Sequence, residues 1–205
     1  MGRFNLAKDA NKKVIAITMG DPCGIGPEIT VKTLADKNVH DKCTPLLIGD
    51  ADVLEQAAQK MGIKHFMGKY ADFIYHVPCN GQITTKNAGK ICDFAGQAAF
   101  DCIKASHLLC SKNKAQSVAT APINKEALKA AGVPYIGHTE IYASLTNTAD
   151  PLTMFDTKGL RVFFLTRHLS LSDAIKAITA EKIKEKAGTD NFEQAFIRIV
   201  KGVAK

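Results

Sequence analysis

Three short segments combine residue types that could bind a small anionic substrate. Thr120-Ala-Pro-Ile-Asn-Lys125 supplies a hydroxyl and a cation, Gly137-His-Thr-Glu140 an imidazole and a hydroxyl, and Leu165-Thr-Arg-His168 a second imidazole. The first and third follow runs that are typical of β-strands. Enzymes of the α/β class place their chemistry at the carboxyl ends of such strands. The pattern therefore indicates a site for an anion that also carries a hydroxyl group.

The individual roles stay open from spacing alone. His138 can donate to a substrate oxygen, and Thr139 can donate or accept. Alternatively, Thr139 caps a helix over 141–145 and His138 is structural. His168 follows a predicted strand, which is a common place for a metal ligand. A metal site needs several ligands, however, and His168 has no partner histidine in the same motif.

A glycine-rich turn lies near the start, in Thr18-Met-Gly-Asp-Pro-Cys-Gly-Ile-Gly-Pro-Glu28. Its glycines, Gly20, Gly24 and Gly26, match neither the Rossmann nor the Walker spacing. One interpretation is that backbone N–H groups face an anion at the start of a helix. The other is a tight connection between strand and helix, with Asp21 as a local cap. A reactive role for Cys23 inside this turn has little support, because no cation is adjacent in sequence.

Strand and helix patterns alternate along the chain. Strands are predicted at 14–19, 45–49, 117–120 and 161–166, and helices from Pro27, over 51–61 and over 88–110. Residues 63–86 are expected to be irregular or hairpin-like. Ser170 to Asp173 resembles a capping box. This order predicts an α/β fold, a three-layer αβα sandwich with a largely parallel sheet.

Composition excludes several protein classes. The 205 residues carry a net charge of +7, but the lysines are dispersed and no nucleic-acid-binding motif occurs. No apolar run is long enough to cross a membrane, and the first residues lack an apolar signal core. The six cysteines form no C-x-x-C pair, so we expect reduced thiols. A cytoplasmic protein is the expectation.

Taken together, the motifs at 18–28, 120–125, 137–140 and 165–168 resemble the 4-hydroxythreonine-4-phosphate dehydrogenase family (PdxA). The resemblance runs from about Val14 to Ile183. It implies that His138 and Thr139 bind substrate and that His168 ligates a divalent metal (Zn, Mg or Co). It also implies NAD or NADP as cofactor and a homodimer. The family's other two metal-binding histidines have no counterpart here, and one of its ligands is expected from the neighbouring subunit.

The family oxidises and decarboxylates a phosphorylated hydroxy acid. The classical substrate is 4-hydroxythreonine 4-phosphate, in pyridoxal phosphate biosynthesis. Residues 163–171 look more like a sister branch that uses phosphothreonate or phosphoerythronate. Two alternatives stay open: a non-catalytic shortened remnant, and a phosphate-ligand binding module without a complete metal site.

The resemblance also predicts the organisation of the chain. We expect a tail at 1–13, a dehydrogenase-like region at 14–183 and a C-terminal helix within 184–205. The fold is expected to be incomplete relative to the family's two-domain, isocitrate-dehydrogenase-like architecture. Residues 184–188 are interpreted as an internal deletion, which joins the front of that fold to its last helix.

Overall fold

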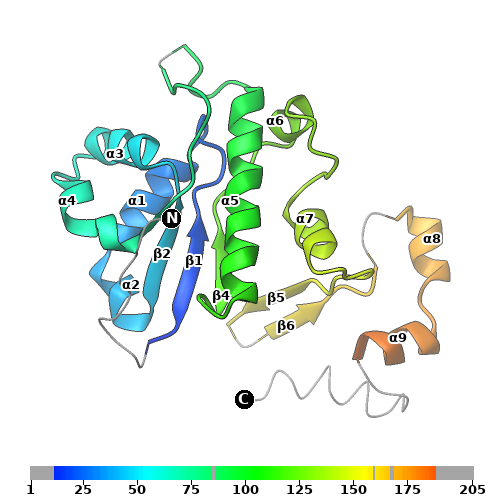
Figure 1. Cartoon of the computed structure of the whole chain (residues 1–205). Coiled ribbons are helices and arrows are strands. Elements are labelled where there is room, and N and C mark those ends of the chain that lie inside the picture. The colour runs from blue at the N-terminus through cyan, green and yellow to red at the C-terminus, as the bar shows by residue number, and fades with distance from the viewer. Residues whose placement is uncertain (1–11, 85, 159, 167–168, 188–205) are drawn as a thin grey trace. The chain divides into compact units, whose positions relative to one another are not determined.

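The computed structural model describes residues 12–84, 86–158, 160–166 and 169–187. The chain forms two compact units, Met1–Thr148 and Ala149–Lys205. Figure 1 shows the elements of both. Among the described residues, no helix is long and apolar enough to span a bilayer.

A four-stranded parallel sheet forms the centre of the first unit. Its order is β3 (Ile74–His76), β2 (Thr44–Gly49), β1 (Val14–Thr18) and β4 (Ser117–Thr120). All three pairings are parallel. The four strands therefore end at one edge of the sheet, where parallel α/β proteins usually bind ligands.

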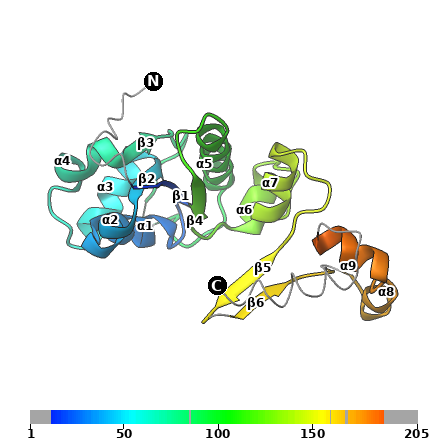
Figure 2. The same ribbon diagram turned by 90° about the horizontal axis from the view of Figure 1, so that it is seen from below.

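Helices cover both faces of this sheet. Figures 1 and 2 show α5 (Asp93–Ser111) on one face, with α1 (Gly26–Ala35) and α3 (Ala51–Lys60) on the other. The remaining helices of this unit are α2 (Lys37–Lys42), α4 (Phe66–Tyr70), the short 3₁₀ helix η1 (Ala71–Phe73), α6 (Lys125–Ala130) and α7 (His138–Leu145). Both α6 and α7 pack against α5. The predicted αβα sandwich with a parallel sheet is confirmed.

Two hydrophobic clusters hold these layers together. The larger cluster joins β1 and β2 to α1, α3 and α5, and includes the fully buried Leu46, Leu47 and Cys102. Burial on both faces explains why these strands read as continuous apolar runs. The smaller cluster contains Ile103 of α5 and Ile141 of α7. It packs α6 and α7 against α5.

Three sequence expectations need correction. Residues 63–86 contain a parallel strand, β3, which pairs with β2 and is not part of a hairpin. The helix predicted over 88–110 begins only at Asp93. The strand predicted at 161–166 lies at Leu160–Phe163 (β6) and pairs antiparallel with Met154–Thr157 (β5), outside the parallel sheet.

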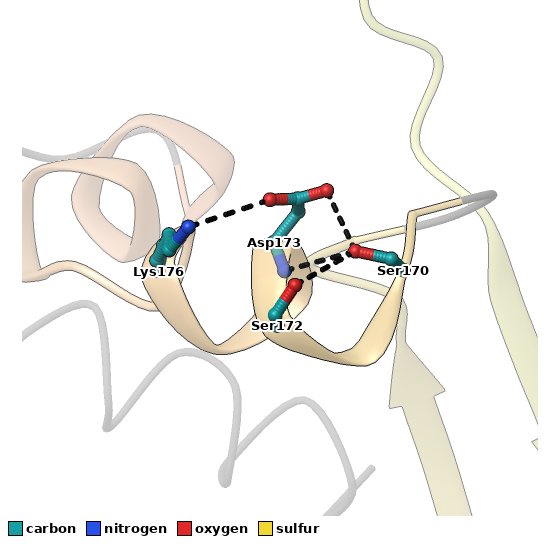
Figure 3. A network of polar contacts seen from close by, with 4 residues as sticks. All are labelled: Ser170, Ser172, Asp173 and Lys176. Atoms are coloured by element: carbon teal, nitrogen blue, oxygen red, sulfur yellow. Dashed lines mark hydrogen bonds and ion pairs between the residues drawn. The ribbon is translucent and has the colours of Figure 1, made fainter.

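The second unit contains this hairpin and two helices, α8 (Leu171–Lys176) and α9 (Ala180–Ala187). Ser170 caps α8, because its hydroxyl accepts from the Asp173 amide at 3.2 Å and donates to Asp173 Oδ2 at 2.6 Å. Lys176 lies 3.8 Å from Asp173 Oδ1 (Figure 3). The predicted N-cap at Ser170 is confirmed, with the Asp173 carboxylate reaching back to the serine hydroxyl. The tail at 1–13 lies mostly outside the described residues, as does the C-terminal helix within 184–205.

Candidate functional site

Two of the predicted motifs meet at the carboxyl edge of the parallel sheet. The Ala121 amide donates to Thr18 O at 3.2 Å, and the Asp21 amide donates to Pro122 O at 2.9 Å. A Cβ atom at Gly20 would lie 2.3 Å from Pro122 O, and Gly20 has a left-handed φ of 76°. Only glycine combines that backbone conformation with so close an approach. Segments about a hundred residues apart in sequence are thereby joined.

The glycine-rich turn uses its polar groups internally. Asp21 Oδ1 accepts from the Cys23 amide at 2.8 Å, and Asp21 O accepts from the Gly24 amide at 3.0 Å. Burial raises the pKa of Asp21, and the interactions of its carboxylate with the backbone amides of Cys23 and Gly24 oppose that shift. Since the amides of residues 21, 23 and 24 are already paired, the turn is better described as a tight connection than as an anion cradle.

Asp50 is a structural residue at the same edge that the sequence reasoning missed. Its Oδ1 accepts from the amides of Asp52 and Val53 at the start of α3, at 2.9 and 3.1 Å. Its Oδ2 accepts from the Cys79 amide at 2.8 Å. One carboxylate therefore joins the end of β2, the start of α3 and the segment after β3. An aspartate between an apolar strand and a helical pattern was the available signal.

The segment from Thr120 to Lys125 divides into structural and accessible parts. Asn124 caps α6, because its side-chain oxygen accepts from the Glu126 and Ala127 amides at 2.9 and 3.0 Å. Thr120 and Lys125 are exposed. The side-chain oxygen of Asn124 is thus used to cap α6, whereas Thr120 and Lys125 face solvent and are available to a ligand.

His138 is the first residue of α7, and Gly137 is the N-cap. Thr139 therefore lies in the first turn, and the alternative that it caps a helix over 141–145 is wrong. The Nε2 atom of His138 is buried and has no hydrogen-bond partner among the described residues. Burial lowers the pKa of His138, so the imidazole is neutral at neutral pH. A buried unpaired ring nitrogen is costly unless something else satisfies it.

The position of α7 is fixed by its packing on α5. The Tyr142 hydroxyl lies 2.7 Å from Ser106 Oγ, and this serine also donates to Ile103 O at 2.7 Å. Ile141 is fully buried beside them. The helix that carries His138 and Thr139 is therefore held at two successive residues, Ile141 and Tyr142.

A cavity of about 550 Å³ lies elsewhere, between the glycine-rich turn, α1 and α3. Lys60 is the one cation among the described residues that line it, and Lys60 forms an ion pair with Glu28. His138, Thr139 and Lys125 do not line this cavity. Its mainly apolar wall and paired lysine do not suit a phosphate.

The metal site expected at His168 stays a prediction. His168 lies outside the described residues, and no three His, Cys, Asp or Glu side chains within the described part of the chain are grouped to hold a metal. The described residues do not by themselves fit a metal centre.

Comparison with known proteins identifies the family to which this chain belongs. Residues 41–197 match the sequence profile of the family described as pyridoxal phosphate biosynthetic protein PdxA. The chain belongs to the PdxA family. Relatives from Clostridium botulinum (strain Hall) and Symbiobacterium thermophilum carry the provisional name D-threonate 4-phosphate dehydrogenase. They are 45% identical over 183 residues and 47% identical over 184, and each match covers 84% of this chain.

Solved structures show the same relationship. The chain is similar to a 4-hydroxythreonine-4-phosphate dehydrogenase from Klebsiella pneumoniae, with a TM-score of 0.74 and 33% identity over 88% of this chain. The enzyme of the same name from Burkholderia phymatum gives 0.72 and 36% over 85%. The match covers 58% and 56% of those two chains. It covers 55% of the Clostridium relative and 54% of the Symbiobacterium one. This chain therefore spans little more than half of its relatives' length.

Proposed function

We propose that this chain contributes to the NAD- or NADP-dependent oxidation of a phosphorylated hydroxy acid. The relatives' names, D-threonate 4-phosphate dehydrogenase and 4-hydroxythreonine-4-phosphate dehydrogenase, support this substrate class. The observation on which the proposal depends most is the unpaired Nε2 of His138, in a motif of the type and order expected from the family.

The proposal gives each site residue a separate role. In this proposal the neutral His138 ring shares a hydrogen bond with a substrate oxygen, and Thr139 orients a second one. Lys125 attracts the phosphate as a compact positive charge. The nicotinamide supplies the hydride acceptor when it is bound. His168 remains the proposed ligand of a divalent metal.

Further parts of the proposal concern setting and assembly. We infer a cytoplasmic protein that takes part in pyridoxal phosphate biosynthesis or in a related use of sugar-acid phosphates. We also propose that the protein forms a homodimer. The β5–β6 hairpin has exposed apolar side chains, such as Phe155 at 62% exposure. Their exposure supports the proposal that a second copy of the chain covers them.

A second candidate is a phosphate-ligand binding protein without turnover. It is favoured by the unpaired Nε2 of His138, which can hydrogen-bond a ligand oxygen whether or not turnover follows. Both candidates place substrate on His138, so they differ in turnover and not in binding.

The test measures binding and turnover on the same protein. D-threonate 4-phosphate and 4-hydroxythreonine 4-phosphate are titrated calorimetrically, and NADH formation is followed with Zn²⁺, Mg²⁺ or Co²⁺ present. We expect binding that falls at least about tenfold in His138→Gln, the equivalent of one lost hydrogen bond to a charged group. His107→Gln is the control, because His107 is another half-buried histidine and lies in none of the motifs.

The outcomes separate the candidates. Turnover that depends on His138 supports the dehydrogenase, and binding without turnover supports the binding protein. If neither phosphorylated acid binds, or if His138→Gln binds both as well as the wild type, both candidates fail.

A further inference from the structure

A short chain of hydrogen bonds with a fixed direction links α7 to α5. The Tyr142 hydroxyl lies 2.7 Å from Ser106 Oγ, and Ser106 Oγ donates to Ile103 O at 2.7 Å. A serine hydroxyl has a single proton, and a carbonyl oxygen can only accept. Since Ser106 gives its proton to Ile103 O, the Tyr142 hydroxyl is the donor to Ser106.

Apolar packing surrounds this chain of hydrogen bonds. Ser106 is fully buried, and Tyr142 is half-buried against the smaller hydrophobic cluster, which contains Ile103 and Ile141. Burial raises the pKa of Tyr142, and its hydrogen bond to Ser106 opposes that shift, so the hydroxyl keeps its proton at neutral pH. A satisfied polar contact in apolar surroundings favours one arrangement of the groups that share it.

The other contacts that hold α7 are less directional. Ile141 and Leu145 pack by apolar contact, which has no preferred direction. The N-cap residue, Gly137, has no side chain that could cap the helix. Within the part of the chain that the structure describes, the contact between Tyr142 and Ser106 is the only hydrogen bond between α5 and α7. It therefore limits how far α7 can rotate about its own axis.

His138 lies one helical turn before Tyr142, and residues four apart project from the same side of a helix. His138, Ile141, Tyr142 and Leu145 follow the spacing of a single helix face. The last three pack in the smaller hydrophobic cluster. A rotation of α7 that displaces Tyr142 therefore displaces the His138 ring as well.

We propose that Tyr142 and Ser106 position the His138 ring for the phosphorylated hydroxy acid. The hydroxyl of Tyr142 is used by Ser106, so Tyr142 acts through His138 and is a positioning residue. A hydrogen bond from a ring nitrogen to a ligand oxygen tolerates little displacement, because it weakens steeply with distance and angle. The proposal rests on the proposed function, since it concerns the same histidine and the same ligand.

The first test measures binding. Tyr142→Phe removes the hydroxyl and keeps the packing of the ring. We expect D-threonate 4-phosphate, titrated calorimetrically, to bind about fivefold more weakly, the equivalent of one neutral hydrogen bond. Ser106→Ala should give a similar loss, and the two changes together no larger one, because both remove the same bond. In a His138→Gln background, Tyr142→Phe should change the affinity by less than about twofold.

Tyr135→Phe is the matched control. The Tyr135 hydroxyl lies 2.8 Å from Oγ of Ser144, another residue of α7, but this pair is exposed to solvent. Water can replace the lost hydrogen bond there, so the affinity should stay within about twofold of the wild type. Circular dichroism and thermal unfolding check that every variant is folded.

A second readout needs no ligand. Burial lowers the pKa of His138. If the hydroxyl of Tyr142 holds the ring in place, its loss lets water reach the ring more often. The pKa of His138, followed by an NMR pH titration, should then rise towards its ordinary value in Tyr142→Phe and not in Tyr135→Phe. A hydrogen bond that only stabilises the fold would lower thermal stability without changing this pKa.

Three results would overturn the proposal. They are unchanged binding by Tyr142→Phe, a loss of the same size in the His138→Gln background, and an unchanged pKa of His138. A failure of the proposed function looks different, because neither phosphorylated acid then binds the wild type. In that case the pKa of His138 in Tyr142→Phe still decides whether Tyr142 positions the ring.

Discussion

Replacing Gly96 by alanine should weaken the contact that positions α6. Gly96 lies in α5, fully enclosed, and a Cβ atom there would lie 2.0 Å from Ala127 O and 2.7 Å from Leu128 N. Ordinary contact begins at 3.4 Å, so one helix must move by about 1.4 Å. The obstacle is the backbone of α6, which cannot rotate away as a side chain can.

The expected magnitude follows from two opposing terms. Alanine gains about 1 kcal/mol over glycine in a helix interior. Overpacking against a fixed neighbour costs about 1–3 kcal/mol, and backbone contact places this site at the upper end. We expect a net loss of about 2 kcal/mol in the free energy of unfolding, measured by urea denaturation, and a melting temperature lower by on the order of 5 °C.

Gly68→Ala is the matched control. Gly68 lies in α4, and a Cβ atom added there would have no neighbouring atom within 4 Å, so the same substitution should stabilise the protein by up to about 1 kcal/mol. If Gly96→Ala is as stable as the wild type, or gains stability like the control, the close packing of α5 on α6 is wrong. The position assigned to Lys125 would then be wrong as well.

Three further predictions concern buried titratable and capping groups. Burial raises the pKa of Cys102 to about 12, so its contribution to stability is complete below pH 9 and is lost as the pH rises towards 12. Between pH 8 and 11, urea unfolding should show a loss about 2–3 kcal/mol larger in the wild type than in Cys102→Ala. Burial lowers the pKa of His138, so stability should fall as the pH drops below 6.5, and His138→Gln should remove that slope. Asp50→Ala loses three accepted hydrogen bonds and should cost about 2 kcal/mol in the same assay, whereas Asp50→Asn should cost less.

Sequence reasoning worked best where one physical signal dominates. The strands β1 and β2 are buried on both faces, so their apolar runs identify them without alternation. The N-cap at Ser170 depends on a local hydrogen bond between neighbours in sequence. Strands β1 and β2 and the capped helix start could therefore be predicted from the sequence.

The misses have equally physical causes. Strand β3 has only three residues and is defined by its pairing with β2, a long-range contact that no local pattern records. The residues of β6 were recognised as a strand, but its partner was not. Lys158 has a left-handed φ of 46°, and a glycine follows it in the sequence, which was the turn signal overlooked.

At the candidate site, the sequence shows which residue types are present. It does not show which of their side chains are already hydrogen-bonded within the fold. Asn124 and Asp21 both lie in motifs that could bind an anion, and both side chains accept from backbone amides of their own turns. The opposite holds for His138, whose unpaired Nε2 could be found only from the packing of α7. Side-chain hydrogen bonding decides between these cases, and spacing alone does not record it.

The most direct test of the account follows the ring nitrogens of His138 by ¹⁵N NMR while D-threonate 4-phosphate is added. The account predicts a saturable shift of the Nε2 resonance of a neutral imidazole, assigned by its loss in His138→Gln, with the His107 resonances unchanged. A His138 resonance that stays constant while the ligand binds elsewhere would contradict the assignment of this histidine to the substrate site.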